Sequence, residues 1–181
     1  MSQPETNNKV LQVSDVDAET IDRLLGRYGL KTERVSDAAP INASFWGEPE
    51  AGIVGRTVFV RSDTPVHSLL HEVCHIICMS AKRRDSLYRD AGGNDLEESA
   101  VCYLQIIVAD CLAGIGRTRL MQDMDRWGYS FRLGNTACWF AGDADDARSW
   151  LLEEGLLTVE NKPVFRLRGT CRAGVTRPIP E

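Results

Sequence analysis

The sequence predicts an α+β domain in which a small antiparallel sheet packs on two long buried helices, with further C-terminal helices and a hairpin. Short β-branched and apolar runs, separated by glycine and proline, indicate the sheet within residues 41–61. Two longer apolar stretches, residues 65–81 and 96–112, indicate the helices, and the second is apolar nearly all round. With 43% hydrophobic residues among 181, the chain can bury a substantial core.

We expect residues 10–168 to form a single domain, flanked by a disordered tail over residues 1–9 and a loose tail over residues 169–181. The polar start of the chain lacks the apolar region of a signal peptide, and no apolar stretch reaches the length of a membrane span. We therefore expect a cytoplasmic protein with no membrane partner, whose six cysteines are reduced. The net charge of −5 argues against a nucleic-acid partner.

The N-terminal part is expected to contain one short helix followed by the sheet. Asp17 can cap an amphipathic helix that ends near Gly29. Residues 41–46 and 53–60 indicate two strands, joined by a turn at residues 47–50. The end of the second run is the most strongly β-branched part of this region and gives the clearest strand signal.

The first long helix is expected to begin after Asp63 or Thr64, because either side chain can act as its N-cap. Pro65 then occupies a favoured first-turn position, and the helix should end near Ala81. A polar connector with a glycine pair, residues 82–94, separates it from the second long helix.

The C-terminal third is expected to hold two more helices, an irregular segment and a hairpin. Residues 120–127 indicate a short helix, and residues 129–140 indicate the irregular segment. Asp143 can cap a last helix over residues 144–154. Two short apolar runs within residues 156–167 then indicate the hairpin.

The first long helix carries a His-Glu-x-x-His motif at His71, Glu72 and His75. Residues four apart lie on the same face of a helix, so the two imidazoles can bind one metal ion. Glu72 follows the first of them, where its carboxylate can take a proton from a metal-bound water. This arrangement is typical of zinc hydrolases. The alternative interpretation is a buried helix that carries two incidental histidines.

A third metal ligand is expected from the start of the second long helix, where Glu97 and Glu98 stand side by side. Glu97 shares a helical stripe with Val101, Leu104 and Val108, so we expect it to face inward and bind the metal. Glu98 lies on a more polar stripe and is expected to support the site or to replace Glu97 as ligand. The alternative is that both residues only favour the positive end of the helix dipole.

Other candidate groups have weaker arguments. His67 lies eight residues before His75, about 12 Å along a helix axis, so one ion cannot bind both. We expect His67 to be a partly exposed first-turn residue or a group that supports a ligand. Cys74 and Cys78 are expected to pack in the core rather than to bind metal. Tyr88, in the connector, is a candidate catalytic residue that donates a hydrogen bond to a developing oxyanion.

The motif and the downstream glutamate resemble the gluzincin type of zinc peptidase, and the short spacing resembles minimal zincins such as the ImmA/IrrE-type peptidases. In those, a Glu-x-Glu-Ala-Asn-x-Phe-Ala helix supplies the third ligand. Residues 97–104 match that pattern at the first glutamate, the alanine and the aromatic position. The resemblance implies a compact zincin-like domain that binds Zn²⁺ and cleaves a protein or peptide substrate.

A second resemblance covers fewer residues. The run from His71 to His75, with Arg83 and Arg84 behind it, is similar in layout to the bacterial elongation factor P hydroxylases. Those enzymes are non-haem metal oxygenases, and two histidines with one carboxylate form a ligand set that Fe²⁺ can use. The resemblance implies Fe²⁺ as the alternative cofactor.

The leading expectation is therefore a metal-dependent, peptidase-like hydrolase, and the first alternative is an iron hydroxylase. A metal that only joins two helices, with Cys78 as fourth ligand, and a binding module without metal are further alternatives. Residues 56–60 lie just before the metal helix, but whether they form an edge strand that pairs with extended substrate is left open. The particular substrate and the oligomeric state are not predicted.

Overall fold

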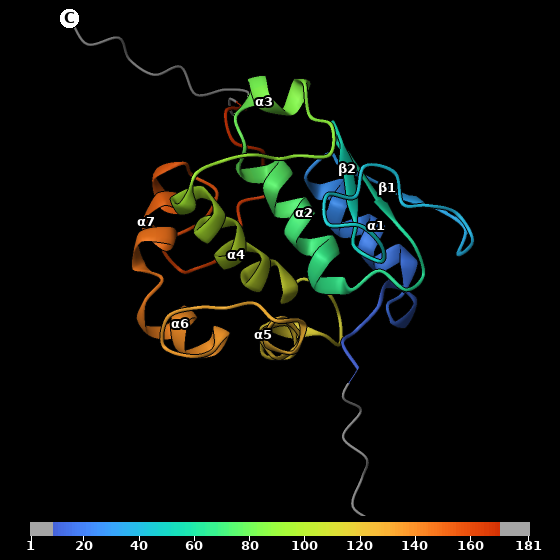
Figure 1. The fold of residues 1–181 in the computed structure, drawn as a ribbon. Helices are drawn as coiled ribbons and strands as arrows, with labels where there is room; N and C mark the ends of the chain where they lie inside the picture. The colour runs from blue at the N-terminus through green and yellow to red at the C-terminus, as the bar shows by residue number, and fades with distance from the viewer. Residues whose placement is uncertain (1–8, 171–181) are drawn as a thin grey trace, which may run out of the picture.

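The computed structural model describes residues 9–170, and the predicted tails over residues 1–9 and 169–181 lie almost wholly outside this range. The described part confirms the α+β class, with seven α-helices and a three-stranded sheet. Two helices cross the centre of the molecule, the sheet and the first helix lie on one side of them, and the C-terminal helices lie on the other (Figure 1). None of the described helices combines the length and the apolar character needed to cross a bilayer.

The sheet differs in part from the expected one. Its strands are β1 (Lys31–Arg34), β2 (Gly52–Val54) and β3 (Thr57–Val60), in the order β1-β3-β2. Residues 53–60, predicted as a single strand, are divided between β2 and β3, which pair antiparallel with each other, and β1 adds to the other side of β3 in parallel. The strand β1 gave no apolar signal because three of its four residues are exposed. Residues 41–46, predicted as a strand, form turns with a single bridge from Ser44 to Gly52.

The two predicted central helices are α2 (Val66–Cys78) and α4 (Asp95–Ala109). Every residue of α2 is buried except His71, and α4 is buried from Ala100 to its end. The α2 helix packs against α4 on one side and against β3 of the sheet on the other, so the core of the domain is formed around the two helices. The same packing brings Glu98, in the first turn of α4, to His71 and His75 in the middle of α2.

The remaining helices surround this pair. They are α1 (Ala18–Arg27), α3 (Ala81–Asp85), α5 (Gly116–Trp127), α6 (Thr136–Gly142) and α7 (Asp145–Glu153), with a 3-10 turn at Val13–Asp15. Asp17 caps α1 as predicted, since its carboxylate accepts a hydrogen bond from the Thr20 amide at 2.9 Å. Asp143 does not cap α7; it ends α6 and pairs with Arg132. The segment predicted to be irregular thus contains α6, and the expected hairpin is reduced to one bridge between Leu157 and Pro163.

A buried arginine fixes the C-terminal end of α2. Arg84 is only 2% exposed, and its guanidinium donates hydrogen bonds to the carbonyl oxygens of Ile76, Met79 and Arg168. The last carbonyls of a helix have no intrahelical partner and carry partial negative charge, so a cation there is favourable. The contact also joins α3 and the segment after α7 to the end of the metal-motif helix.

Candidate metal centre

The two motif histidines lie on one face of α2, as the spacing predicts. Their rings meet edge to face with centroids 4.6 Å apart, and the Nε2 atoms of His71 and His75 are 3.1 Å apart. Two ring nitrogens at this distance are joined by a shared proton or by a shared cation. The α2 helix therefore directs both imidazoles to a single point.

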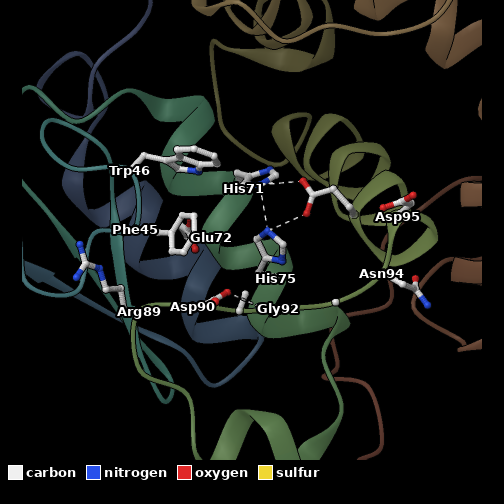
Figure 2. A pocket seen from close by; sticks show the side chains of 13 residues that line it. Phe45, Trp46, His71, Glu72, His75, Arg89, Asp90, Gly92, Asn94 and Asp95 are labelled. Atoms are coloured by element: carbon white, nitrogen blue, oxygen red, sulfur yellow. Dashed lines mark hydrogen bonds and ion pairs between the residues drawn. The ribbon is translucent and has the colours of Figure 1, made fainter.

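A carboxylate from the first turn of α4 completes a triangle with them. Glu98 Oε1 lies 3.3 Å from His71 Nε2, and Glu98 Oε2 lies 3.3 Å from His75 Nε2 (Figure 2). A tetrahedral ion with ligand bonds of about 2.0–2.1 Å separates its ligand atoms by about 3.3 Å. The three side chains thus fit a small divalent cation, and they are the one group of potential ligands of this kind within residues 9–170.

Glu97, which we expected to bind the metal in preference to Glu98, is directed elsewhere. Its buried carboxylate accepts hydrogen bonds from Arg83 Nη1 at 2.7 and 3.0 Å, and from Arg168 Nη1 at 3.3 Å. Consecutive residues of a helix point about 100° apart, so only one of the two glutamates can face the histidines. Glu97 does face inward, as its helical stripe predicts, but its partners on that side are two arginines and not the histidines of the motif.

A hydrogen bond orients the ring of His71. Its Nδ1 atom lies 2.7 Å from Gln105 Oε1, and with this oxygen as acceptor the Nε2 atom is the one that carries the lone pair in the neutral ring. Burial opposes a proton on His71, but Tyr129, Cys102 and Glu98 around it favour positive charge, and the pKa of His71 is raised. The surroundings of His71 are therefore suited to a cation.

His75 is held in its neutral form. Burial, together with the neighbouring His71, lowers the pKa of His75 to about 3. Its Nδ1 atom is buried and has no hydrogen-bond partner within the described chain. Burial raises the pKa of Glu98, but the hydrogen bond and the charge of His71 outweigh this effect, so the Glu98 pKa is lowered and the group is ionised. A neutral imidazole and a carboxylate are the forms in which these side chains bind metals.

Glu72 lies beside the triangle, where a general base is expected. It is 6% exposed and lines the same cavity as His71 and His75. Burial raises its pKa to about 7, and the negative charges of Glu50 and Glu98 act in the same direction. A carboxyl group with a pKa near 7 can both accept and release a proton at neutral pH. Within residues 9–170 no hydrogen bond or ion pair engages this carboxylate.

The triangle stands where two cavities meet, and both are lined by Trp46, His71, Asp95 and Glu98. One cavity, of about 290 Å³, extends over Glu72 and the loop of residues 89–94 (Figure 2). The other, of about 710 Å³, extends toward the segment after α5. The side chain of Glu98 is 50% exposed. An ion held here therefore has an open side for a water molecule or a substrate.

Tyr88 does not contribute its side chain to this centre. It is 64% exposed, its backbone bridges to Val54, and it lines neither cavity. The tyrosine at the centre is Tyr129, whose ring lies 6.0 Å from that of His71. Burial raises the pKa of Tyr129 to about 12, so its hydroxyl stays a hydrogen-bond donor at neutral pH. Tyr129 follows α5 in an irregular stretch, and no motif in the sequence marks it.

His67 is buried rather than partly exposed, which corrects the expectation for it. Only 1% of its surface is accessible, and its ring packs against those of Trp127 and Tyr129 at 5.0 and 5.6 Å. Cys74 and Cys78 are buried in the core, as expected, and neither belongs to the ligand group. The nearest thiol is Cys102, whose Sγ lies 3.9 Å from Glu98 Oε1. It follows Glu98 by one turn of α4.

Within residues 9–170, the strand that packs on α2 and the β2 edge beside it are both already paired. The strand β3, which contains residues 57–60, is central and is paired on both sides. On the outer side of β2, Ile53 O accepts a hydrogen bond from the Arg89 amide at 2.9 Å, and Gly55 N donates to Leu87 O at 3.0 Å. Bridges to residues 44 and 88 cover the rest of this edge. Pairing of an extended substrate with this edge would require the segment of residues 87–89 to leave.

The Glu97 network also holds the loop that lines the smaller cavity. The Arg83 guanidinium bonds to the Ala91 carbonyl oxygen as well as to Glu97. Gly93 has a φ of +128°, and a Cβ atom there would lie 3.1 Å from Glu97 Oε1, so this position requires glycine. The glycine pair noted in the sequence thus lets the loop approach the start of α4.

Comparisons with protein families, with curated proteins and with solved structures give no match to this chain. The resemblances to zinc peptidases and to elongation factor P hydroxylases therefore rest on the residues quoted for them. The function is inferred below from the geometry of the centre.

Proposed function

We propose that the protein is a zinc-dependent hydrolase that acts on a protein or peptide, with the metal held by His71, His75 and Glu98. The observation that carries the proposal is the approach of these three side chains where two cavities meet: the two Nε2 atoms are 3.1 Å apart, and each lies 3.3 Å from a different oxygen of Glu98. Two imidazoles and one carboxylate with an open fourth position form the usual protein ligand set of catalytic zinc.

Zinc bound at such a site polarises a carbonyl group and makes a coordinated water more acidic. The residues of the chain supply the proton transfer and the positioning of the metal ligand and the substrate. Glu72 accepts a proton on one side of the site and returns it to the leaving amine, since it is buried beside His71 and lines the same cavity. Gln105 fixes the ring of His71, and the hydroxyl of Tyr129 is a candidate donor to a substrate oxygen.

A purely structural metal is less well supported. Structural zinc sites are closed by four protein ligands, and the candidate for the fourth was Cys78. Burial raises the pKa of the Cys78 thiol well above its ordinary value, which opposes the thiolate form that zinc binds. The half-exposed Glu98 and the two adjoining cavities also favour an open centre.

The iron hydroxylase is the second candidate, because the donor set itself supports it. Two histidines and one carboxylate also form the facial triad of non-haem Fe²⁺ oxygenases. An octahedral ion with bonds of about 2.1–2.2 Å separates adjacent ligands by about 3.1 Å, so the observed distances suit both metals. The distances between the donor atoms therefore do not distinguish zinc from iron, and metal analysis of the purified protein does.

The proposal is tested by metal analysis and by Glu72→Gln. Purified protein is expected to contain one equivalent of zinc and to cleave peptides from a fluorogenic library. Glu72→Gln should retain the zinc and lose roughly 10²–10⁴-fold in kcat, because only proton transfer is removed. Glu33→Gln, on exposed β1, is the control and should behave as the parent protein. Oxygen-sensitive iron would favour the hydroxylase, and full activity of Glu72→Gln would exclude the mechanism.

The cytoplasmic location is part of the same proposal. The five cysteines within residues 9–170 are free, and three of them are buried in the core. A reducing compartment keeps thiols in this state.

A further inference from the structure

The larger of the two cavities has aromatic walls. Trp46, Trp127, Tyr129 and Phe131 line it, and it continues from His71 and Glu98 of the metal centre. Trp46 is 73% exposed and Trp127 is 39% exposed, so their rings are available to a ligand. Figure 2 shows Trp46 on the same rim as His71. With about 710 Å³ of space, the cavity accommodates a long side chain.

Apart from the histidine of the metal centre, the ionisable side chains of this cavity that carry charge at neutral pH are acidic. Glu50, Asp95 and Glu98 line it, and no lysine or arginine does. Glu98 belongs to the metal centre, which leaves Glu50 and Asp95 without a cationic counterpart. Neither forms an ion pair within residues 9–170.

Glu50 is held in place by neutral groups. Its Oε1 atom accepts a hydrogen bond from Trp127 Nε1 at 3.1 Å, and its Oε2 atom lies 3.5 Å from Ser68 Oγ. These contacts orient the carboxylate without neutralising it. The carboxylate is therefore fixed against one of the aromatic walls, and its charge is free to act on a ligand.

Aromatic faces beside a carboxylate are suited to one class of ligand. The faces of tryptophan and tyrosine attract a cation, and the apolar stem of a lysine or arginine packs on the same rings. A neutral apolar group would remove water from Glu50 and give no compensating interaction, and an anionic group would be repelled.

We propose that this cavity is the subsite for a basic side chain, lysine or arginine, of the peptide substrate. The proposal rests on the proposed hydrolase function for the position of the scissile bond, but the binding of the side chain does not depend on catalysis. Glu50 and the aromatic rings are then specificity-determining residues beside the metal centre.

The test is a binding experiment on the zinc-loaded protein, using Nα-acetyl-lysine amide and Nα-acetyl-norleucine amide as probes. The two differ in the terminal ammonium group and have side chains of nearly equal length. Binding is followed from the indole N–H signals of Trp46 and Trp127 in two-dimensional NMR spectra. We expect the lysine probe to bind about fivefold more tightly than the norleucine probe.

Glu50→Gln keeps the shape of the side chain and a hydrogen-bond acceptor for Trp127. It should abolish the preference for lysine and leave the affinity for norleucine within about twofold. Glu33→Gln removes an exposed charge on β1 and should leave the preference intact.

The subsite is rejected if norleucine binds as tightly as lysine, if neither probe shifts the indole signals, or if Glu50→Gln retains the preference. Zinc content and peptide cleavage are measured on the same samples. Loss of cleavage or of zinc with an intact lysine preference would overturn the hydrolase and retain the subsite. Cleavage without a lysine preference would overturn the subsite and retain the hydrolase.

Discussion

Glu97 and Glu98 are neighbours in the first turn of α4, yet their carboxylates lie in opposite surroundings. Glu97 is 8% exposed and is neutralised by Arg83 and Arg168. Glu98 is 50% exposed and faces His71 and His75, which carry no permanent charge. On one side of the helix a buried charge is balanced within the protein. On the other side, a carboxylate faces two imidazoles, and no lysine or arginine within residues 9–170 pairs with it. The first arrangement is that of a structural ion pair, and the second is the one that the proposed function uses.

The largest effect expected from removing either of these two glutamates is on the affinity for metal. Glu98→Ala removes one of the three proposed protein ligands, and about 10–16 kcal/mol of binding free energy shared among the four ligands of a structural zinc site corresponds to about 2.5–4 kcal/mol per ligand. We therefore expect a loss of about 10³-fold in zinc affinity, measured by competition with a chromogenic chelator. Glu97→Ala is the matched control and should lose less than about tenfold. Equal losses in both variants would mean that the two glutamates do not have separate roles.

The converse effect is on folding. Glu97→Ala leaves two partly buried arginines without their carboxylate, which costs about 3 kcal/mol for a network of this kind. The arginines are 34% and 26% exposed, so we expect the lower end of the range for buried pairs. Urea denaturation of the metal-free protein measures this loss. Glu98→Ala, compared in the same way, should change the free energy of unfolding by less than about 1 kcal/mol.

A smaller effect is expected from the group behind the metal ligand. Gln105→Leu keeps the size of a buried side chain but removes the acceptor for His71 Nδ1. Partners of ligating histidines contribute about 10- to 100-fold to metal affinity, and we expect the lower value because the His71 ring also packs on Tyr129. The exposed Gln122→Leu on α5 is the control. Unchanged zinc affinity in Gln105→Leu would show that the ring is held by packing alone.

The sequence and the structure agree where periodicity or spacing determines the result. The four-residue spacing of His71 and His75 already places both imidazoles on one face, and the apolar character of α2 and α4 identifies the core. The choice between Glu97 and Glu98 depends on Arg83 and Arg168, and Arg168 lies 71 residues from Glu97 in the chain. No local pattern contains that information. A strand such as β1 also leaves no apolar pattern in the sequence, because most of its residues are exposed and it pairs through its backbone.

Tyr129 illustrates the same limit at the centre itself. It is brought to His71 by the turn that follows α5, and Gly128 at a φ of +104° ends that helix. Gly128 is recognisable as a helix terminator, but the direction in which the chain leaves depends on how α5 packs against α2 and α4. The aromatic wall of the larger cavity, which includes Trp127 and Phe131, depends on the same packing. Sequence reasoning placed His71, His75 and a glutamate of α4 at one site, preferred Glu97 to Glu98, and missed the residues that a loop adds.

The smallest expected effect concerns His67, the buried histidine that lies one turn before His71 on α2. Burial lowers its pKa from the ordinary 6.5 to about 4, although the charge of Asp123 acts in the opposite direction. In the unfolded chain His67 is protonated as the pH falls through about 6.5, whereas in the folded protein it stays neutral down to about pH 4. The free energy of unfolding therefore decreases as the pH drops from 6.5 toward 4. Between pH 7.5 and 5.5 this amounts to about 1 kcal/mol. His67→Leu should show a loss of stability on acidification that is smaller by this amount, measured by urea denaturation of the metal-free proteins. An unchanged difference between the two pH values would mean that His67 is protonated in the folded state, in contrast to its packing between Trp127 and Tyr129.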